Sequence, residues 1–119
     1  MTSIPEPATS DKGMYMRIAW GRLKPGHWGA YQDAFEAAYR DAALPGLKAR
    51  YLIQDVTQPD SGFSISIWET EADLAAYDRS EFLARHTELM KEHFTGVFNV
   101  QRCRIAAAHR FGSASPGDL

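Results

Sequence analysis

The stretch FSISIWETEAD, residues Phe63–Asp73, decides the fold because it holds a strand, the start of a helix and the junction between them. From Phe63 to Ile67, large apolar side chains alternate with serine, and this period of two is typical of a strand. Thr70 can cap the first turn of a helix, and Asp73 stands where the acid of a capping box belongs. A strand that leads directly into a helix predicts a mixed α and β domain.

The residues before this stretch complete a predicted hairpin. Ala49–Thr57 (ARYLIQDVT) is typical of a strand, and Gln58–Gly62 (QPDSG) has the composition of a turn. Further upstream, Met14–Leu23 (MYMRIAWGRL) alternates large apolar residues with other residues and predicts the first strand, which ends at Lys24-Pro25-Gly26.

Helical spacing replaces the period of two on either side of the hairpin. Between His27 and Ala43, apolar residues recur every three or four positions and predict an amphipathic helix, which Leu44-Pro45-Gly46-Leu47 ends. After the short helix at Thr70, a second helix is predicted from Ser80 to about Phe94, with Thr95-Gly96 as its stop.

The last predicted strand is Phe98–Ala107 (FNVQRCRIAA), so the element order is β-α-β-β-α-β. This order predicts an α+β, ferredoxin-like domain with a four-stranded antiparallel sheet over residues 14–108. Residues 1–13 and 109–119 lack hydrophobic periodicity and are predicted to be a flexible leader and a flexible tail.

Both faces of the predicted sheet are apolar. Met16, Ile18 and Trp20 share one face of the first strand, and the third strand carries Ile65 on one face and Trp68 on the other. Two helices can cover only one face, so the other needs a cover as well. We therefore expect a homodimer in which two sheets pack face to face.

Composition narrows the classes of partner. The chain has 119 residues, a formal net charge of -2 and no block of like charges, which argues against binding to nucleic acid or to an anionic membrane surface. It has one cysteine, Cys103, no signal-peptide pattern and no apolar run of membrane-spanning length. These features favour a cytoplasmic protein.

His86 is the first candidate for chemistry because it lies on the apolar stripe of its predicted helix, and histidine can act as acid, base or ligand near neutral pH. His93 follows two turns later, roughly 10 Å along the axis, too far to share one metal ion with His86. No metal-binding spacing is present, so no metal site is expected. Cys103 is expected to be a small apolar side chain.

The ordered set of these pieces resembles the antibiotic biosynthesis monooxygenase domains of the dimeric α/β barrel superfamily. The resemblance covers roughly Met14 to Ala107. The pieces that carry it are Lys24-Pro25-Gly26, Pro45-Gly46-Leu47, Trp68-Glu69-Thr70, Tyr77, Ser80 and His86.

The resemblance implies a dimeric barrel with a cleft between sheet and helices in each subunit. It implies a cofactor-independent monooxygenase, or a related enzyme, acting on an aromatic or polyketide-like molecule, with His86 and Tyr77 as catalytic residues. Aromatic side chains suit a cleft for flat organic ligands, and an inward arginine can stabilise an enolate or phenolate oxygen. The candidate substrate-binding residues are Trp20, Tyr39, Tyr51, Trp68 and Arg17.

Two alternatives stay open. One is a heme-binding or heme-degrading protein with His86 as axial ligand; that branch of the family has an asparagine near position 21 and a tryptophan at position 77, where this chain has Gly21 and Tyr77. The other is a non-catalytic dimer that binds a small ligand.

Overall fold

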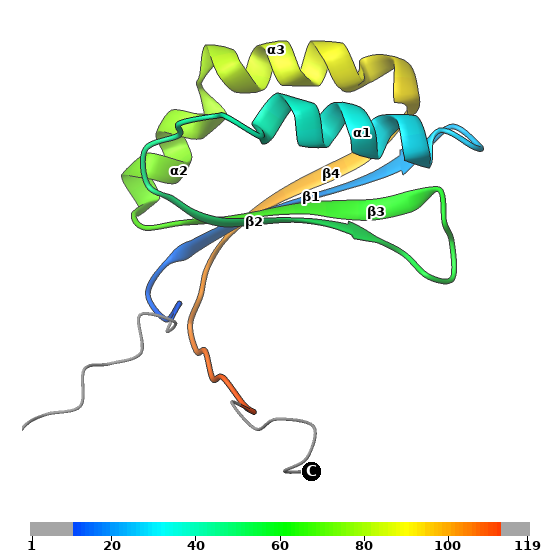
Figure 1. Cartoon of the computed structure of the whole chain (residues 1–119). Coiled ribbons are helices and arrows are strands. Elements are labelled where there is room, and N and C mark those ends of the chain that lie inside the picture. The colour runs from blue at the N-terminus through cyan, green and yellow to red at the C-terminus, as the bar shows by residue number, and fades with distance from the viewer. Residues whose placement is uncertain (1–10, 113–119) are drawn as a thin grey trace, which may run out of the picture.

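The computed structural model describes residues 11–112 and confirms the ferredoxin-like α+β fold (Figure 1). Residues 1–10 and 113–119, most of the predicted leader and tail, lie outside the described residues. The elements are β1 (Tyr15–Leu23), α1 (Trp28–Tyr39), β2 (Leu47–Gln54), β3 (Ser61–Trp68), α2 (Glu71–Asp78), α3 (Glu81–Met90), a short 3-10 helix (Lys91–His93) and β4 (Phe94–Arg104).

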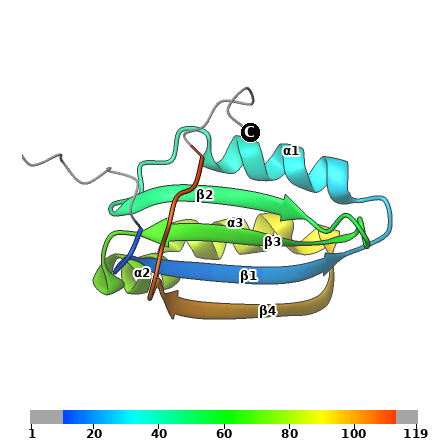
Figure 2. The same cartoon turned by 90° about the horizontal axis from the view of Figure 1, so that it is seen from below.

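The four strands form one antiparallel sheet in the order β2-β3-β1-β4. All three α-helices lie on one face of this sheet, and the opposite face has no helix over it (Figures 1 and 2). After β4 the chain leaves on the side away from the helices (Figure 1). None of the described helices is long and apolar enough to cross a membrane.

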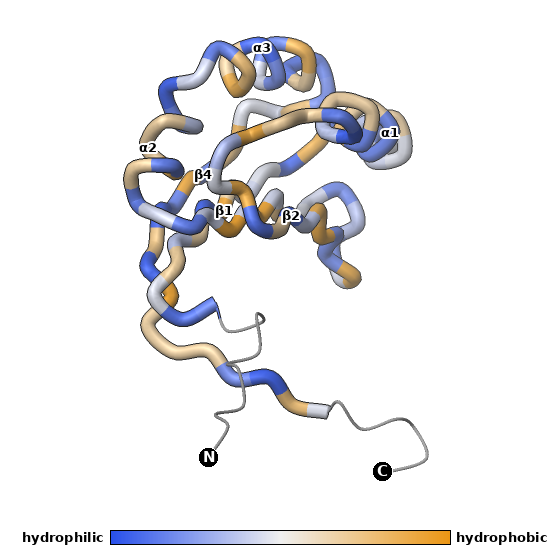
Figure 3. The backbone as a smooth tube through the Cα atoms, turned by 60° about the vertical axis from the view of Figure 1, so that its left-hand side comes forward, coloured by the Kyte–Doolittle hydropathy of each residue, from blue (hydrophilic) through white to orange (hydrophobic). Residues whose placement is uncertain are grey.

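The core fills the space between the helices and the sheet. In α1 and α3, hydrophobic and hydrophilic residues alternate around each turn (Figure 3), which turns one apolar side toward the strands. The buried apolar cluster consists of Leu23, Tyr31, Phe35, Tyr39, Trp68, Leu74, Tyr77 and Met90. Aromatic residues from α1 and α2 therefore face the sheet directly.

The predicted helix starts are present. The Thr70 hydroxyl accepts a hydrogen bond from the Asp73 amide at 3.0 Å, and the Ser80 hydroxyl accepts one from the Leu83 amide at 3.1 Å. Asp73 does not complete a reciprocal capping box with the Thr70 amide; its carboxylate accepts a hydrogen bond from the Thr70 hydroxyl at 2.8 Å. The Ser80 cap fixes where α3 begins and so sets the direction in which His86 points.

The helical run reaches His93 through the 3-10 helix, close to the predicted end, but the prediction for the start of the last strand was wrong, because β4 begins at Phe94 and not at Phe98. The helix ends at Met90, and Thr95-Gly96, predicted to stop it, lies inside β4. Gly96 has a φ of +98°, and β4 bulges there against β1, where the Thr95 hydroxyl donates to the Arg22 carbonyl at 3.0 Å. The glycine therefore forms part of a β-bulge. A residue with left-handed backbone geometry can occur in a β-bulge as well as at the end of a helix.

Alternation along the strands separates two sets of side chains. The outer face, on the side away from the helices, is predominantly apolar, and its exposed members include Tyr51, Ile53 and Phe63, with 51%, 42% and 36% of their surface accessible. Met16, Ile18 and Trp20 of β1 share this face by register. This confirms that the sheet is apolar on both faces.

Candidate active site

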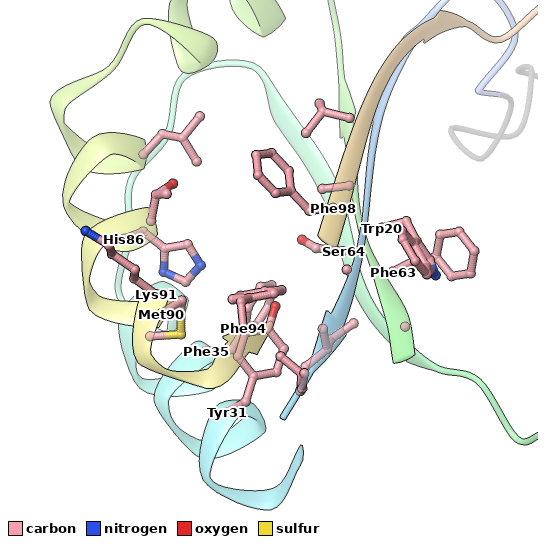
Figure 4. Close-up of a pocket in the computed structure, with 18 of the residues that line it drawn as sticks. Trp20, Tyr31, Phe35, Phe63, Ser64, His86, Met90, Lys91, Phe94 and Phe98 are labelled. Carbon is pink, nitrogen blue, oxygen red and sulfur yellow. The ribbon is translucent and has the colours of Figure 1, made fainter. Parts of the chain in front are cut away.

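A pocket of about 400 Å³ opens between the sheet and the helices α1 and α3 (Figure 4). Its wall is mostly aromatic and aliphatic, and a few polar groups project into it, as expected of a site for a small organic molecule. The lining includes Arg17, Tyr31, Tyr39, Tyr77, His86, Lys91 and Phe98.

His86 projects from α3 into this pocket (Figure 4). Its ring meets Phe35 and Tyr39 edge-on, with ring centres 5.4 and 4.8 Å away. Nδ1 is buried and has no hydrogen-bond partner among the described residues. Burial, with a smaller contribution from the positive charges of Arg50 and Arg17, lowers the pKa of His86 to about 4. The imidazole is therefore neutral near pH 7.

Two tyrosines form a hydrogen-bonded pair beside His86. The hydroxyls of Tyr39 on α1 and Tyr77 on α2 bond to each other, and both residues line the pocket. Burial raises the pKa of both phenols, so each keeps its proton. One hydroxyl donates to the other, and the accepting hydroxyl retains a proton that it can donate to a ligand.

Cations flank the tyrosine pair on both sides. The Arg50 guanidinium stacks on Tyr39, 3.6 Å from the ring centre, and the Arg17 guanidinium lies 5.5 Å from the ring centre of Tyr77. Arg50 has no carboxylate partner among the described residues. Positive charge at this end of the pocket favours a ligand oxygen that carries negative charge.

Arg17 is held in place by Asp78. Its Nε donates to Asp78 Oδ1 at 2.7 Å, while Arg102 on β4 donates to the other carboxylate oxygen. Burial alone would raise the pKa of Asp78, but the hydrogen bonds from Arg102 and Arg17 hold it below its usual value. The carboxylate thus stays ionised and fixes the guanidinium of Arg17 at the pocket wall.

The structure brings four of the predicted site residues together, namely His86, Tyr77, Tyr39 and Arg17. It does not bring in Trp68 or Tyr51, while Trp20 is among the residues that line the pocket but has its side chain on the outer face. Trp68 is 1% exposed and packs behind Tyr77, with ring centres 4.7 Å apart, so it supports the wall without forming it.

Strand parity turns the side chains of Tyr51 and Trp20 away from the helices. Tyr51 points to the outer face, because its neighbours Arg50 and Leu52 occupy the helix side of β2. Trp20 borders the pocket only along its strand, and its side chain lies on the outer face beside Phe63 (Figure 4). The alternation was visible in the sequence, but which parity faces the helices was not.

Three contributors were not singled out from the sequence. Tyr31 and Phe35 precede Tyr39 at intervals of four, so all three share one side of α1 and line the pocket. This spacing is a signal that would have identified them together. Burial raises the pKa of Tyr31 to about 12, with the nearby Tyr77 adding to the effect. The stacking of Arg50 on Tyr39 had no sequence signal, since it depends on the pairing of β2 with the sheet.

The pocket does not fit the residue set of heme degradation. A Cβ atom at Gly21 would overlap the ring of Phe94, so the position of the family's asparagine has no room for a side chain. Across residues 11–112, no group of three or more His, Cys, Asp and Glu residues could hold a metal ion.

Comparison with known proteins places the chain in a family. Residues 14–96 match the family model described as antibiotic biosynthesis monooxygenase. No curated protein sequence matches the chain. The structure is similar to candidate antibiotic biosynthesis monooxygenases of Nitrosomonas europaea and Bordetella bronchiseptica, each with a TM-score of 0.69, at 15% and 19% identity.

Those two alignments cover 78% of this chain in each case, and 90% and 97% of the respective relatives. At such low identity the structural likeness supports the fold alone, while the family model covers most of the sequence. The chain belongs to the antibiotic biosynthesis monooxygenase family.

Proposed function

We propose that the protein is a cofactor-independent monooxygenase that oxidises a flat, phenolic, polyketide-like molecule in the pocket between sheet and helices. The observation that carries the proposal is the neutral, unpartnered His86 beside the tyrosine pair in an aromatic-walled pocket. A base, hydroxyl donors and cations around one apolar space suit the formation of a stabilised carbanion.

The reaction begins when the substrate loses a proton from a carbon next to its aromatic ring. His86 takes this proton, directly or through a hydroxyl of the substrate. The negative charge spreads to the phenolic oxygen, where the free hydroxyl of the Tyr39–Tyr77 pair and the Arg17 guanidinium stabilise it. A bound anion also offsets the two arginine charges that depress the basicity of His86, so the substrate itself makes His86 a better base.

Molecular oxygen completes the step without another reductant. The carbanion transfers electrons to O₂ and forms a carbon–oxygen bond, giving a peroxide at that carbon. The peroxide then loses water, so the CH₂ group becomes a carbonyl, one oxygen atom stays in the product and the other leaves in water. The pocket wall shields the carbanion from bulk water, which would otherwise return its proton.

An anthrone tests this proposal for two reasons. Loss of a proton from its CH₂ group gives an anion that is stabilised as a phenolate, and the quinone formed by its oxidation is coloured. We expect the protein to accelerate quinone formation with uptake of one O₂ per product, and we expect His86→Ala to lose about 100-fold or more of the rate. His109→Ala is the matched control, because that histidine lies outside the pocket lining. Rates equal to the buffer blank, or a fully active His86→Ala, would contradict the proposal.

Two other outcomes identify the alternatives. Saturable binding of the anthrone with no oxidation indicates a small-ligand-binding protein. Titration with hemin distinguishes the second alternative: a shifted Soret band that disappears in His86→Ala would assign heme ligation to His86, whereas the obstructed position at Gly21 leads us to expect no such band.

A further inference from the structure

Two histidines outside the pocket lining point their ring nitrogens at each other. His27 follows the Lys24-Pro25-Gly26 turn at the start of α1, and His93 ends the 3-10 helix before β4. Their Nδ1 atoms are 3.1 Å apart although the residues are 66 positions apart in sequence. Neither residue lines the pocket, so the pair is distinct from the site described above.

The backbone holds this pair in place. The Lys24 amide donates to the His93 carbonyl at 2.8 Å, which joins the turn before His27 to the residue that carries the second ring. The His93 side chain is buried, 8% exposed, and its ring packs edge-on against Tyr31. His27 is half-buried at the surface, so solvent reaches the pair from its side. Two preformed imidazoles at a solvent-accessible position are a starting point for metal coordination.

From this arrangement, we propose that His27 and His93 chelate one borderline transition-metal cation, with Cu²⁺ as the tightest of the series, through their Nδ1 atoms. Two bonds of about 2.0–2.1 Å to nitrogens 3.1 Å apart enclose an angle of roughly 100°. That angle suits adjacent positions of a square-planar or tetrahedral ion.

The surroundings determine which ions fit. The only side-chain hydrogen bond of either imidazole among the described residues is the one between them, so no other side-chain donor occupies the Nδ1 lone pairs. Imidazole nitrogen favours Cu²⁺, Zn²⁺ and Ni²⁺, whereas Mg²⁺ and Ca²⁺ require oxygen ligands. No third protein ligand joins the pair among residues 11–112, so water completes the coordination.

Titration of the full chain with CuCl₂ at neutral pH, followed by electron paramagnetic resonance, tests the site without any substrate. We expect one Cu²⁺ per chain and a spectrum with nitrogen hyperfine structure. His27→Gln and His93→Gln should each weaken the affinity by about tenfold or more, because one ligand of the chelate is lost. His109→Gln and His86→Gln are the matched controls and should bind as the wild type does.

Circular dichroism verifies that each variant is folded. If the buried His93→Gln does not fold, the half-exposed His27→Gln decides the test. Two results overturn the proposal: no uptake of Cu²⁺ at tens of micromolar ion, which leaves the pair as an N–H···N hydrogen bond only, or equal affinity in His27→Gln and wild type, which places the ion elsewhere. Both results are independent of whether the chain oxidises an anthrone.

Discussion

The hydroxyls of Tyr39 and Tyr77 meet inside the pocket although one residue belongs to α1 and the other to α2. The bond joins the two helices at the lining of the pocket in which the proposed substrate lies. Both phenols are buried, and among the described side chains each hydroxyl has the other as its hydrogen-bond partner. The pair is therefore a unit, and its members should not act independently.

We expect Tyr39→Phe and Tyr77→Phe each to lower the free energy of unfolding by about 1–3 kcal/mol, because each leaves one buried hydroxyl without a partner. The double substitution removes both hydroxyls and should cost less than the sum of the two. Urea unfolding of the four proteins measures this coupling. The exposed Tyr51→Phe serves as control, and strictly additive losses would contradict the coupling.

His86 should titrate far below an ordinary histidine. Burial and the charges of Arg50 and Arg17 lower its pKa from 6.5 to about 4, so between these values the unfolded chain binds a proton at this residue that the folded chain does not. The free energy of unfolding therefore falls as the pH falls through this window, by about 3 kcal/mol for this group alone.

Proton NMR of the imidazole signals measures the pKa of His86 directly, with His86→Gln used to assign the resonance. A midpoint near 6.5 would contradict the burial that the structure shows. Addition of a phenolate ligand should move the midpoint upward, since an anion in the pocket favours the protonated ring.

Asp78→Asn should destabilise the protein more than the removal of a charge from an exposed side chain does. The substitution leaves the Arg17 guanidinium, whose side chain is 12% exposed, without its carboxylate. We expect a loss of about 1–3 kcal/mol in urea unfolding at pH 7. Glu69→Gln is the matched control: its partner Lys48 is 3.2 Å away, both side chains are exposed, and the loss should stay within about 0.5 kcal/mol.

Because hydrogen bonds hold the pKa of Asp78 below its usual value, the stability contributed by this carboxylate is present above pH 3.8. It is lost as the pH falls through the folded-state pKa below that value. The difference between wild type and Asp78→Asn should therefore shrink in acid, and a constant difference would exclude the ion pairs as its source.

Gly21→Ala should destabilise the domain, since the added methyl group meets the Phe94 ring. We expect a loss of about 1–3 kcal/mol, typical of an overpacked core. Phe94→Leu in the same chain should recover part of that loss by making room. Thermal unfolding of the single and double variants tests this, and no recovery in the double variant would place the strain elsewhere.

The outer face of the sheet should hold two copies of the chain together. Phe63 lies on this face in β3, an inner strand of the sheet, so Phe63→Arg should convert a dimer into a monomer at micromolar concentration, as measured by light scattering during size exclusion. Leu89→Arg changes an exposed residue of α3, 63% accessible, and should leave the mass unchanged. A monomeric wild type would refute the predicted homodimer.

The sequence predicted the element order because each strand and helix has its own hydrophobic period and is bounded by turn or cap residues. The strand FSISIW followed by the Thr70 cap is an example. Its error at Thr95-Gly96 has a physical cause: a left-handed glycine ends a helix and bulges a strand equally well, and only the pairing of β4 with β1 decides between them. Local sequence carries no information about that pairing.

The candidate site was predicted in part for the same reason. His86 and Tyr39 lie on amphipathic helices, whose apolar side must face the sheet. Tyr51 and Trp20 lie on strands that are apolar on both faces, so the sequence could not tell which side the helices cover. Arg50 and Asp78 acquire their roles only through contacts between β2 and α1 and between α2, β1 and β4.

The bulge at Gly96 also bears on how the protein avoids aggregation. β4 is an edge strand of 11 residues with Val97 and Phe98 exposed, and an edge of that length and composition invites another chain to add to it. The left-handed glycine interrupts the row of free backbone groups near one end, and Arg104 places a charge near the other. A strand that added to this edge would meet the irregular backbone at one end and the charged side chain at the other, so β4 resists growth into a continuous intermolecular sheet.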